Sequence, residues 1–155
     1  MLKKDYREDE GQRIEGERHA AVVIKDGKIL LIHRIKNNFE YYVFPGGHRR
    51  VNEEGVETAV RETKEETEIT VKAGKLAFKF QDNFFNQTDF YYLCSWKKGE
   101  NPHLGGDEKI NNRPENFYEP MWVKLEMAES LNILPQFAKF WLLENLTILC
   151  SKNCS

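Results

Sequence analysis

The sequence predicts an α/β fold, and three observations support that class. Two apolar runs at residues 19–25 and 28–34 are joined only by Asp26-Gly27, a dipeptide typical of tight β-hairpins. Apolar and small residues then recur at helical spacing from about residue 55 to residue 67. Further strand-like runs follow before an apolar C-terminal segment. Strands on both sides of a helix along the chain indicate an α/β layout.

The other elements are expected from local composition and turn residues. In chain order they are a charged N-terminal stretch at 1–17 (a loose arm or an extra strand), a short strand at 41–44 that leads to Pro45-Gly46-Gly47, two strands at 72–80 and 88–97 paired as a second hairpin across an Asn-rich loop, a long irregular stretch at 99–116, a last strand at 119–125, and a helix that opens at Leu134-Pro135. Loops as long as the one at 99–116 are often functional.

Composition limits the class of protein. The chain has 155 residues, enough for one domain over 1–155 with its own core. Its net charge of −2 excludes a basic footprint for nucleic acid. The absence of a long apolar run and of a signal peptide predicts a protein that binds no membrane and is cytoplasmic. Three cysteines do not suggest a disulfide framework, and a metal role for Cys150 and Cys154 is not expected.

Three glutamates in the expected helix share one face. With Glu62 at zero, Glu65 lies at about 300° and Glu66 at about 40° around the helix axis. Like charges at these spacings oppose helix formation. A divalent cation such as magnesium or manganese would turn that repulsion into binding, whereas a solvated acidic face is the plainer alternative. The packing face of the same helix is expected to comprise Val56, Ala59, Val60, Thr63 and Thr67.

The residues around these three glutamates favour a metal site over a solvated acidic face. The chain carries the pattern G-x5-E-x7-R-E-x-x-E-E as Gly47, Glu53, Arg61, Glu62, Glu65 and Glu66, preceded by Phe44-Pro45-Gly46. This pattern resembles the signature of the Nudix (MutT-like) hydrolases. Over residues 19–146 the order of elements also resembles the Nudix fold. The resemblance implies an α/β/α sandwich with a mixed central sheet.

The resemblance also implies roles for the matching residues. Glu62, Glu65 and Glu66 would bind Mg²⁺ or Mn²⁺, and Glu62 would also orient or deprotonate the attacking water. The carbonyl of Gly46 would add a further ligand. The expected cofactor is therefore a divalent cation held by oxygen ligands.

The remaining members of the pattern would support the metal ligands. Arg61 would pair with a glutamate of the pattern and hold the loop. Glu53 would help to fix the geometry between loop and helix. Gly46 and Gly47 would let the backbone turn tightly beside the metal and the substrate.

The chain departs from the family pattern at two positions. Thr63 stands where an aliphatic residue is usual, and Glu68 stands where a glycine is usual. That glycine would cap the helix in a left-handed conformation. Glu68 therefore requires either backbone strain or a different exit from the helix. Neither departure removes a charged member of the pattern.

Residues outside the pattern are candidates for substrate binding. Arg34 ends an apolar strand and can reach a substrate phosphate, although an exposed strand-end charge explains it equally well. Glu115 or Glu119 is expected to supply a further acid, with loop solvation as the alternative for each. The aromatic residues that can flank a base, or simply fill the core, are Tyr41, Tyr42 and Phe44.

These features predict a metal-dependent pyrophosphohydrolase in which water attacks a phosphorus of an X-linked nucleoside diphosphate. The sequence has no motif for a covalent nucleophile and no P-loop. The expected substrate is a nucleoside triphosphate or an ADP-ribose-like compound, which the sequence does not separate. The alternative function is a catalytically silent module of the same fold that senses a nucleotide or a protein. The apolar C-terminal helix is also compatible with a homodimer contact.

Overall fold

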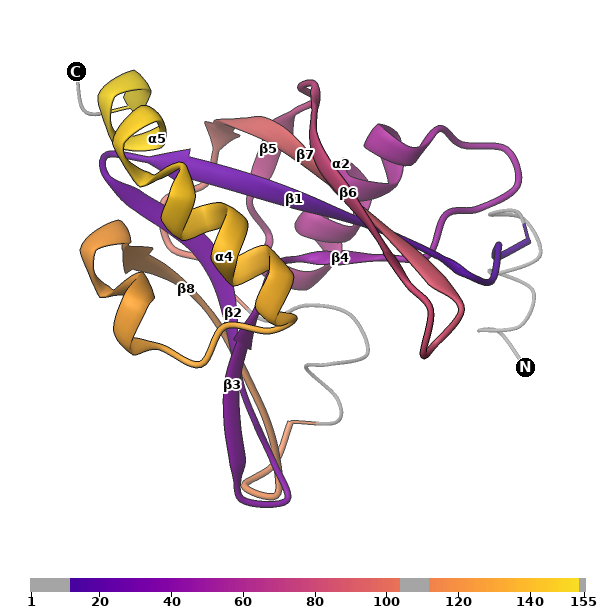
Figure 1. Ribbon diagram of the computed structural model, residues 1–155, viewed down its shortest axis with the longest axis horizontal. Helices are drawn as coiled ribbons and strands as arrows, with labels where there is room; N and C mark the ends of the chain where they lie inside the picture. The colour runs from indigo at the N-terminus through magenta and orange to yellow at the C-terminus, as the bar shows by residue number, and fades with distance from the viewer. Residues whose placement is uncertain (1–11, 104–111, 154–155) are drawn as a thin grey trace.

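The computed structural model describes residues 12–103 and 112–153 (Figure 1). The strands are β1 (Glu17–Lys25), β2 (Lys28–Lys36), β3 (Phe39–Val43), β4 (Gly46–Gly47), β5 (Thr70–Lys72), β6 (Leu76–Asp82), β7 (Gln87–Lys98) and β8 (Asn116–Lys124). The helices are α2 (Gly55–Thr67), the 3-10 helix η1 (Leu125–Ser130), α4 (Gln136–Glu144) and α5 (Leu146–Asn153). The order confirms the predicted α/β class.

The strands within the described residues form one mixed sheet. Its central order is β3-β2-β1-β7-β5, while β4 pairs with β1, β6 with β7 and β8 with β2. The β1–β7 pair is parallel, from Glu17↔Thr88 to Ile24↔Ser95, and the other strand pairs are antiparallel. Because β4 also lies along the first half of β1, the glycine pair sits at the centre of the molecule rather than on a loose loop.

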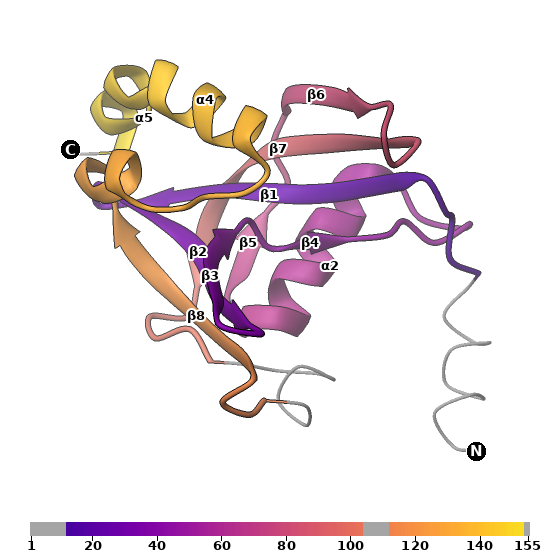
Figure 2. The same cartoon turned by 60° about the horizontal axis from the view of Figure 1, so that its bottom comes forward.

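Helices cover both faces of the sheet, which confirms the predicted α/β/α sandwich. In Figure 2, α2 lies below the sheet, and α4, α5 and η1 lie above it. Each interface has its own core. The α2 side buries Ala21, Val23, Leu30, Ala59, Ile69, Val71 and Cys94. The larger core on the other side includes Val22, Leu31, Phe44, Tyr91, Ile133, Ala138 and Leu142.

The β1–β2 hairpin confirms the Asp26-Gly27 prediction. Asp26 and Gly27 have φ values of 51° and 73°, and Lys25 pairs with Lys28. These angles are the ones that a two-residue hairpin turn with the right twist requires. A second turn of this kind joins β2 to β3 through Asn37 and Asn38, with φ values of 52° and 66°. Asparagine tolerates this region better than other residues with a Cβ, and the sequence analysis did not anticipate this turn.

Two strand predictions were wrong in detail. The run at 72–80 is not one strand, because β5 and β6 are separate and both pair with β7. Gly74 lies between them, where a Cβ would collide with the carbonyl of Leu93, so the chain crosses closely over β7 at this point. The last strand begins at Asn116 and not at residue 119.

The C-terminal part also differs from the prediction. A 3-10 helix follows β8, and the expected single helix is interrupted at Asn145 between α4 and α5. Part of the N-terminal stretch, residues 1–11, and part of the long loop, residues 104–111, lie outside the described residues. Among the described helices, none is both long and apolar enough to cross a membrane.

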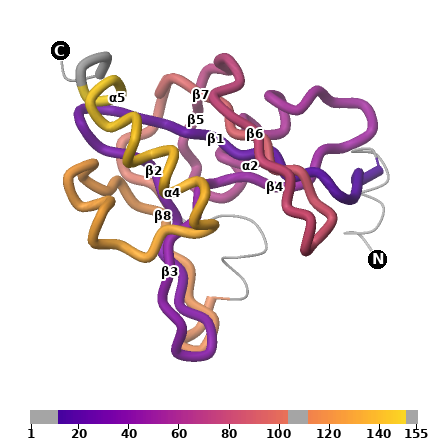
Figure 3. The backbone as a smooth tube through the Cα atoms, viewed as in Figure 1, coloured from indigo at the N-terminus to yellow at the C-terminus, as the bar shows by residue number. Residues whose placement is uncertain are grey.

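The ends of β2, β3 and β8 extend together beyond the body of the sheet. Figure 3 shows these three chain segments side by side at the bottom of the molecule. The register places Tyr41, Arg34 and Tyr118 next to one another across the three strands. We call this extension, formed by residues 33–36, 39–42 and 116–119, the three-stranded arm.

Candidate active site

Helix α2 carries the acidic residues, and its two ends are fixed by local contacts. At the start, the backbone N–H of Glu54 donates to the carboxylate of Glu57 at 2.7 Å. At the end, Glu68 adopts the left-handed conformation with φ 64°, and its N–H donates to the carbonyl of Lys64 at 2.9 Å. The helix therefore ends in the left-handed conformation that the usual glycine would adopt. This conformation is energetically unfavourable for a glutamate, because its side chain has a Cβ.

The inner face of α2 is built largely from threonine. Its buried residues are Thr58, Ala59, Thr63 and Thr67. Thr63 donates to the carbonyl of Ala59 at 2.7 Å, and Thr67 donates to that of Thr63 at 2.6 Å. Since each hydroxyl is satisfied within the helix, Thr63 replaces the usual aliphatic residue without leaving a buried polar group unpaired. The expected residues Val56 and Val60 are only partly buried.

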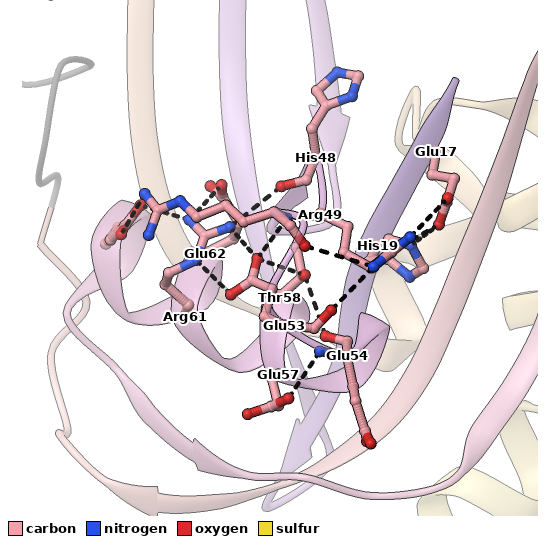
Figure 4. A network of polar contacts seen from close by, with 12 residues as sticks. Glu17, His19, His48, Arg49, Glu53, Glu54, Glu57, Thr58, Arg61 and Glu62 are labelled. Atoms are coloured by element: carbon pink, nitrogen blue, oxygen red, sulfur yellow. Dashed lines mark hydrogen bonds and ion pairs between the residues drawn. The ribbon is translucent and has the colours of Figure 1, made fainter. Parts of the chain in front are cut away.

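Arg61 connects the loop to the acidic face of the helix (Figure 4). Its guanidinium donates to both carboxylate oxygens of Glu53, at 2.7 and 3.1 Å, and to the backbone carbonyl of His48 at 3.2 Å. Nη1 also contacts Glu62 at 2.9 Å and Glu65 at 3.3 Å. One cation therefore holds three carboxylates. The sequence analysis expected Arg61 to pair with a glutamate of the pattern, and here its guanidinium contacts three of them.

Glu53 lies at the centre of the loop contacts. It accepts hydrogen bonds from Arg61, from the Thr58 hydroxyl at 2.7 Å and from the backbone N–H of Arg50 at 3.0 Å. Burial alone would raise the pKa of Glu53, but these donors outweigh it and lower the pKa to about 2. Glu53 is thus an anion that ties the loop to the first turn of α2.

Glu62 has the opposite electrostatic environment. Its side chain is 20 % exposed, and burial raises the pKa of this carboxyl although Arg61 opposes the effect. Glu65 raises the Glu62 pKa further by charge repulsion. Gly47 packs directly against this side chain, since a Cβ there would lie 2.5 Å from Cδ of Glu62. A side chain at position 47 would therefore displace the Glu62 carboxylate.

Glu66 and the backbone of Gly46 meet on the same side of the sheet. The N–H of Gly46 donates to the Glu66 carboxylate at 2.8 Å. The carbonyl of Gly46 accepts a hydrogen bond from Nη1 of Arg18 at 3.2 Å, and Nη2 of Arg18 donates to the carbonyl of Phe44 at 2.8 Å. A Cβ at Gly46 would lie 2.6 Å from Cα of Ala20, so this glycine permits the close pairing of β4 with β1.

A second polar network supports the N-terminal end of α2 (Figure 4). His19 is almost fully buried, with Nε2 at 2.8 Å from Glu17 and Nδ1 at 2.9 Å from the Tyr92 hydroxyl. Arg49 bridges Glu17 at 3.2 Å and the carbonyl of Glu53 at 3.1 Å. The hydrogen bond from Arg49 lowers the pKa of Glu17. This network positions the loop that Glu53 and Arg61 hold from the other side.

Arg34 lies on the α2 face of the three-stranded arm, since it alternates with Leu30 of the α2-side core. Its guanidinium stacks on the Tyr118 ring at 3.6 Å and donates to the Asn116 side chain at 2.8 Å. The Tyr41 ring is 5.6 Å away. Nε of Arg34 is buried and has no hydrogen-bond partner among the described residues. A guanidinium placed over an aromatic ring can donate to an anionic ligand through its remaining N–H groups.

Other predicted substrate residues lie elsewhere. Glu119 pairs with His33 in register and raises the pKa of Tyr42, which places it on the opposite face of the sheet from α2. Glu115 is 64 % exposed and lies 3.8 Å from Arg113 at the start of β8. No hydrogen bond or ion pair among the described residues joins either one to the acidic face of α2. The structure therefore does not assemble the expected further acid.

The predicted aromatic residues are divided in the same way. Tyr41 faces Arg34, whereas Tyr42 stacks on His33 at 4.6 Å on the other side of the sheet. Phe44 is 1 % exposed and packs in the larger core. The core alternative was therefore right for Phe44, and only Tyr41 lies beside a candidate ligand-binding group.

The expected metal ligands fit a hard divalent cation in chemistry, because Glu62, Glu65, Glu66 and the Gly46 carbonyl offer only oxygen. Their arrangement is not that of a finished metal site. Within the described ranges, no three acidic, histidine or cysteine side chains converge closely enough to hold an ion. Arg61 instead neutralises two of the carboxylates, and Glu66 accepts from Gly46. A bound cation would replace protein contacts that already balance the charges.

Sequence reasoning missed several residues of the network. Arg18, His19 and Arg49 act through contacts to backbone carbonyls or to residues far away in sequence. The positions of these residues in the sequence do not predict the contacts, because the pairing of β1 with β4 brings them to the loop. Thr58 had a weak local signal, since it follows Glu53 by five residues at the start of the helix.

Comparison with known proteins shows the family of this chain. A family model described as the NUDIX domain matches residues 17–141. The chain therefore belongs to the Nudix family. It is accordingly a hydrolase that acts on phosphoric anhydride bonds. A comparison with curated protein sequences gives no match.

Solved structures show the same fold at low identity. The Escherichia coli ORF135 protein aligns with a TM-score of 0.62 and 22 % identity, over 92 % of this chain and 93 % of that one. The MutT protein of Methanosarcina mazei also aligns with a TM-score of 0.62 and 22 % identity, over 84 % and 91 %. A Nudix-family hydrolase from Clostridium perfringens gives 0.65 and 17 %, over 88 % and 99 %.

Proposed function

We propose that this protein is a metal-dependent pyrophosphohydrolase that cleaves nucleoside triphosphates or ADP-ribose-like compounds. The observation that carries the proposal is the arrangement around Arg61. The carboxylates of Glu62 and Glu65 both accept hydrogen bonds from the Arg61 guanidinium. The carboxylate of Glu66 accepts one from the backbone N–H of Gly46. This cluster of oxygen ligands beside a glycine turn suits a divalent cation and the phosphates that bind to it.

The expected roles follow from the local environments. Mg²⁺ or Mn²⁺ would be held by Glu62, Glu65, Glu66 and the Gly46 carbonyl, and would supply neutralisation of phosphate charge. Glu62 is the best candidate to orient the attacking water and accept its proton, since burial raises its pKa toward the range useful to a base. Arg61 positions the carboxylates and does not need to touch the substrate.

Arg34 is proposed to bind the substrate. Its hydrogen bond to Asn116 and its position over the Tyr118 ring hold the guanidinium on the α2 face of the sheet, and its buried Nε has no partner among the described residues. An arginine in such a frame binds phosphate through two parallel hydrogen bonds with little loss of side-chain freedom. Glu115 and Glu119 have no comparable support. The homodimer and the cytoplasmic location stay predictions from the sequence.

The test is a substrate panel with purified protein and Mg²⁺. Nucleoside triphosphates are scored by pyrophosphate release, using added inorganic pyrophosphatase. ADP-ribose and similar diesters are scored by phosphate that alkaline phosphatase removes from the products. We expect activity on at least one class. The nucleotide products, separated by ion-exchange chromatography without coupling enzymes, should disappear with a chelator and return with excess Mg²⁺.

Glu66→Gln is the matched variant for this test. It keeps the shape of the side chain and removes the charge, so we expect at least about a 100-fold loss of turnover with an unchanged thermal unfolding temperature. Activity near that of the wild type would contradict the metal site. Silence across the whole panel, together with tight nucleotide binding, would favour the catalytically silent module instead.

A further inference from the structure

Arg18 is a positively charged residue beside the glycine turn. The proposed function gives this side chain no role. It lies on β1, and its side chain is half-buried next to the segment that joins β3 to β4. Its two terminal nitrogens donate to the carbonyls of Phe44 and Gly46, at 2.8 and 3.2 Å. Both acceptors belong to the segment that leads into the glycine pair of the pattern, so Arg18 bridges the two ends of that segment.

Arg18 differs from Arg61 in what it binds. Arg61 contacts three carboxylates, whereas Arg18 forms no ion pair with any carboxylate of the described residues and donates to neutral carbonyls. Burial raises the pKa of both Glu62 and Asp89, and the charge of Arg18 partly opposes that rise without an ion pair to either carboxylate. The charge of Arg18 is therefore not neutralised by a bonded carboxylate of the described residues.

The contact with Gly46 conflicts with cation binding at the same carbonyl. Two positive groups that share one oxygen lie within a few ångströms of each other and repel strongly where water is scarce. A divalent cation bound at the Gly46 carbonyl would therefore compete with the guanidinium for this oxygen. Nη1 of Arg18 would then need another acceptor nearby.

A substrate phosphate is the acceptor that fits. A divalent cation in a hydrolase of phosphoric anhydrides sits against phosphate oxygens, so the phosphate would lie next to Gly46. Arg18 already directs its two nitrogens to two oxygens on one side of the turn. Planar guanidinium groups bind two oxygens of a phosphate in the same manner.

We propose that Arg18 is a substrate-binding residue that holds the Gly46 carbonyl in the cation-free enzyme and moves to a substrate phosphate when a cation takes that carbonyl. The proposal rests on the proposed function, because it needs a cation at Gly46. It adds a second phosphate-binding arginine, Arg18, across the glycine turn from Glu66. A purely structural clamp on the turn is the alternative.

The two roles predict opposite effects on metal binding. Arg18→Gln keeps an amide that can donate to one carbonyl and removes the charge. If Arg18 competes with the cation, this variant binds Mn²⁺ without nucleotide about fivefold more tightly than the wild type, measured by electron paramagnetic resonance of free Mn²⁺. If Arg18 only holds the turn, the variant binds Mn²⁺ equally or more weakly, and the proposal is overturned.

Phosphate binding is measured in the same samples. With saturating Mn²⁺, the Arg18→Gln variant should bind inorganic pyrophosphate about tenfold more weakly by calorimetry, because a two-oxygen contact to an arginine is lost. Tighter Mn²⁺ binding together with weaker pyrophosphate binding is the expected result. Unchanged pyrophosphate binding would also overturn the proposal.

Controls separate the charge effect, the fold and the proposed function. Lys28→Gln removes a charge from an exposed position on β2 and should change neither affinity. If Arg18→Gln does not fold, Arg18→Lys keeps the charge, and it should bind Mn²⁺ like the wild type but pyrophosphate more weakly. Wild-type protein that binds Mn²⁺ no better than Glu62→Gln would refute the proposed function itself, and the Arg18 proposal with it.

Discussion

The acidic side of α2 and the three-stranded arm differ in how completely their charged side chains are paired within the protein. Around α2, each predicted charged residue has a protein partner within hydrogen-bond distance, and Arg61 alone joins Glu53, Glu62 and Glu65. On the arm, Arg34 relies on ring stacking and one amide, and its Nε stays without a partner among the described residues. The charges of the first region are paired within the protein, whereas the guanidinium of the second is only partly hydrogen-bonded to the described residues.

The difference separates two tasks. A dense network of paired charges fixes positions to within fractions of an ångström, which catalysis of phosphoryl transfer requires. An incompletely satisfied cation between aromatic rings selects a ligand and tolerates variation in its shape. Substitutions in the α2 network should therefore affect both stability and turnover, whereas substitutions on the arm should affect binding alone.

Arg61→Met gives the largest expected effect. It leaves Glu53, Glu62 and Glu65 close together without their shared cation, which should lower the free energy of unfolding by about 4 kcal/mol. Turnover should also fall by at least about 100-fold, since the carboxylates lose their positions. Chemical denaturation and steady-state kinetics check both values.

The matched control is an exposed arginine just before β8, outside the three-stranded arm. Arg113→Met removes an arginine that is 60 % exposed and 3.8 Å from Glu115, so the free energy of unfolding should change by less than about 0.5 kcal/mol. Equal losses in the two variants would contradict the contrast between a buried network and an exposed ion pair.

Acid should weaken the α2 network through Glu53. Its pKa is lowered from 4.5 to about 2, so its contribution is fully present above pH 4.5 and is lost as the pH falls toward 2. The shift corresponds to about 3 to 4 kcal/mol at neutral pH as an upper limit. We therefore expect the stability difference between the wild type and Glu53→Gln to be large at pH 7 and to shrink steadily below pH 4.5. A difference that stays constant from pH 7 to pH 2.5 would show that Glu53 is not held as an anion.

Arg34→Met tests the arm. Because the guanidinium is proposed to contact a substrate phosphate, we expect KM to rise about tenfold while kcat changes less than about twofold. Thermal unfolding should be nearly unchanged. Tyr118→Phe is the control, since it keeps the ring beneath Arg34 and should leave KM as it is. A fall in kcat at constant KM would place Arg34 in the catalytic network instead.

The same contrast explains what the sequence predicted and what it missed. The α2 network lies within 14 residues from Glu53 to Glu66, so helical geometry and a local pattern were enough to predict it. Arg34 meets Tyr41 and Tyr118 only because β2 pairs with β3 and β8 in one particular register. Arg18 reaches Gly46 only because β4 returns to β1. Register between distant strands depends on the whole core, so no local pattern reports it.

Errors in the strand prediction have a similar origin. Residues 72–80 contain Gly74. A prediction from composition treats a single glycine as a weak position within a strand and not as its end. The break arises from the approach of this glycine to Leu93 on β7, a contact between segments 19 residues apart. Glu119 was a reasonable acid by position, but alternation along β8 turns it to the face opposite α2.

The smallest effect concerns the end of α2. Glu68 occupies the left-handed region at φ 64°, which costs a residue with a Cβ about 1 kcal/mol relative to glycine. The contacts at this position use its backbone, since its N–H donates to the Lys64 carbonyl and its carbonyl accepts from Lys64 Nζ. Glu68→Gly should therefore raise the free energy of unfolding by about 0.5 to 1 kcal/mol and leave turnover unchanged. Glu68→Ala is the control, because alanine keeps the Cβ and should give no such gain. If both variants were equally stabilising, the benefit would come from removing an acidic charge at the negative end of the helix dipole and not from the backbone conformation.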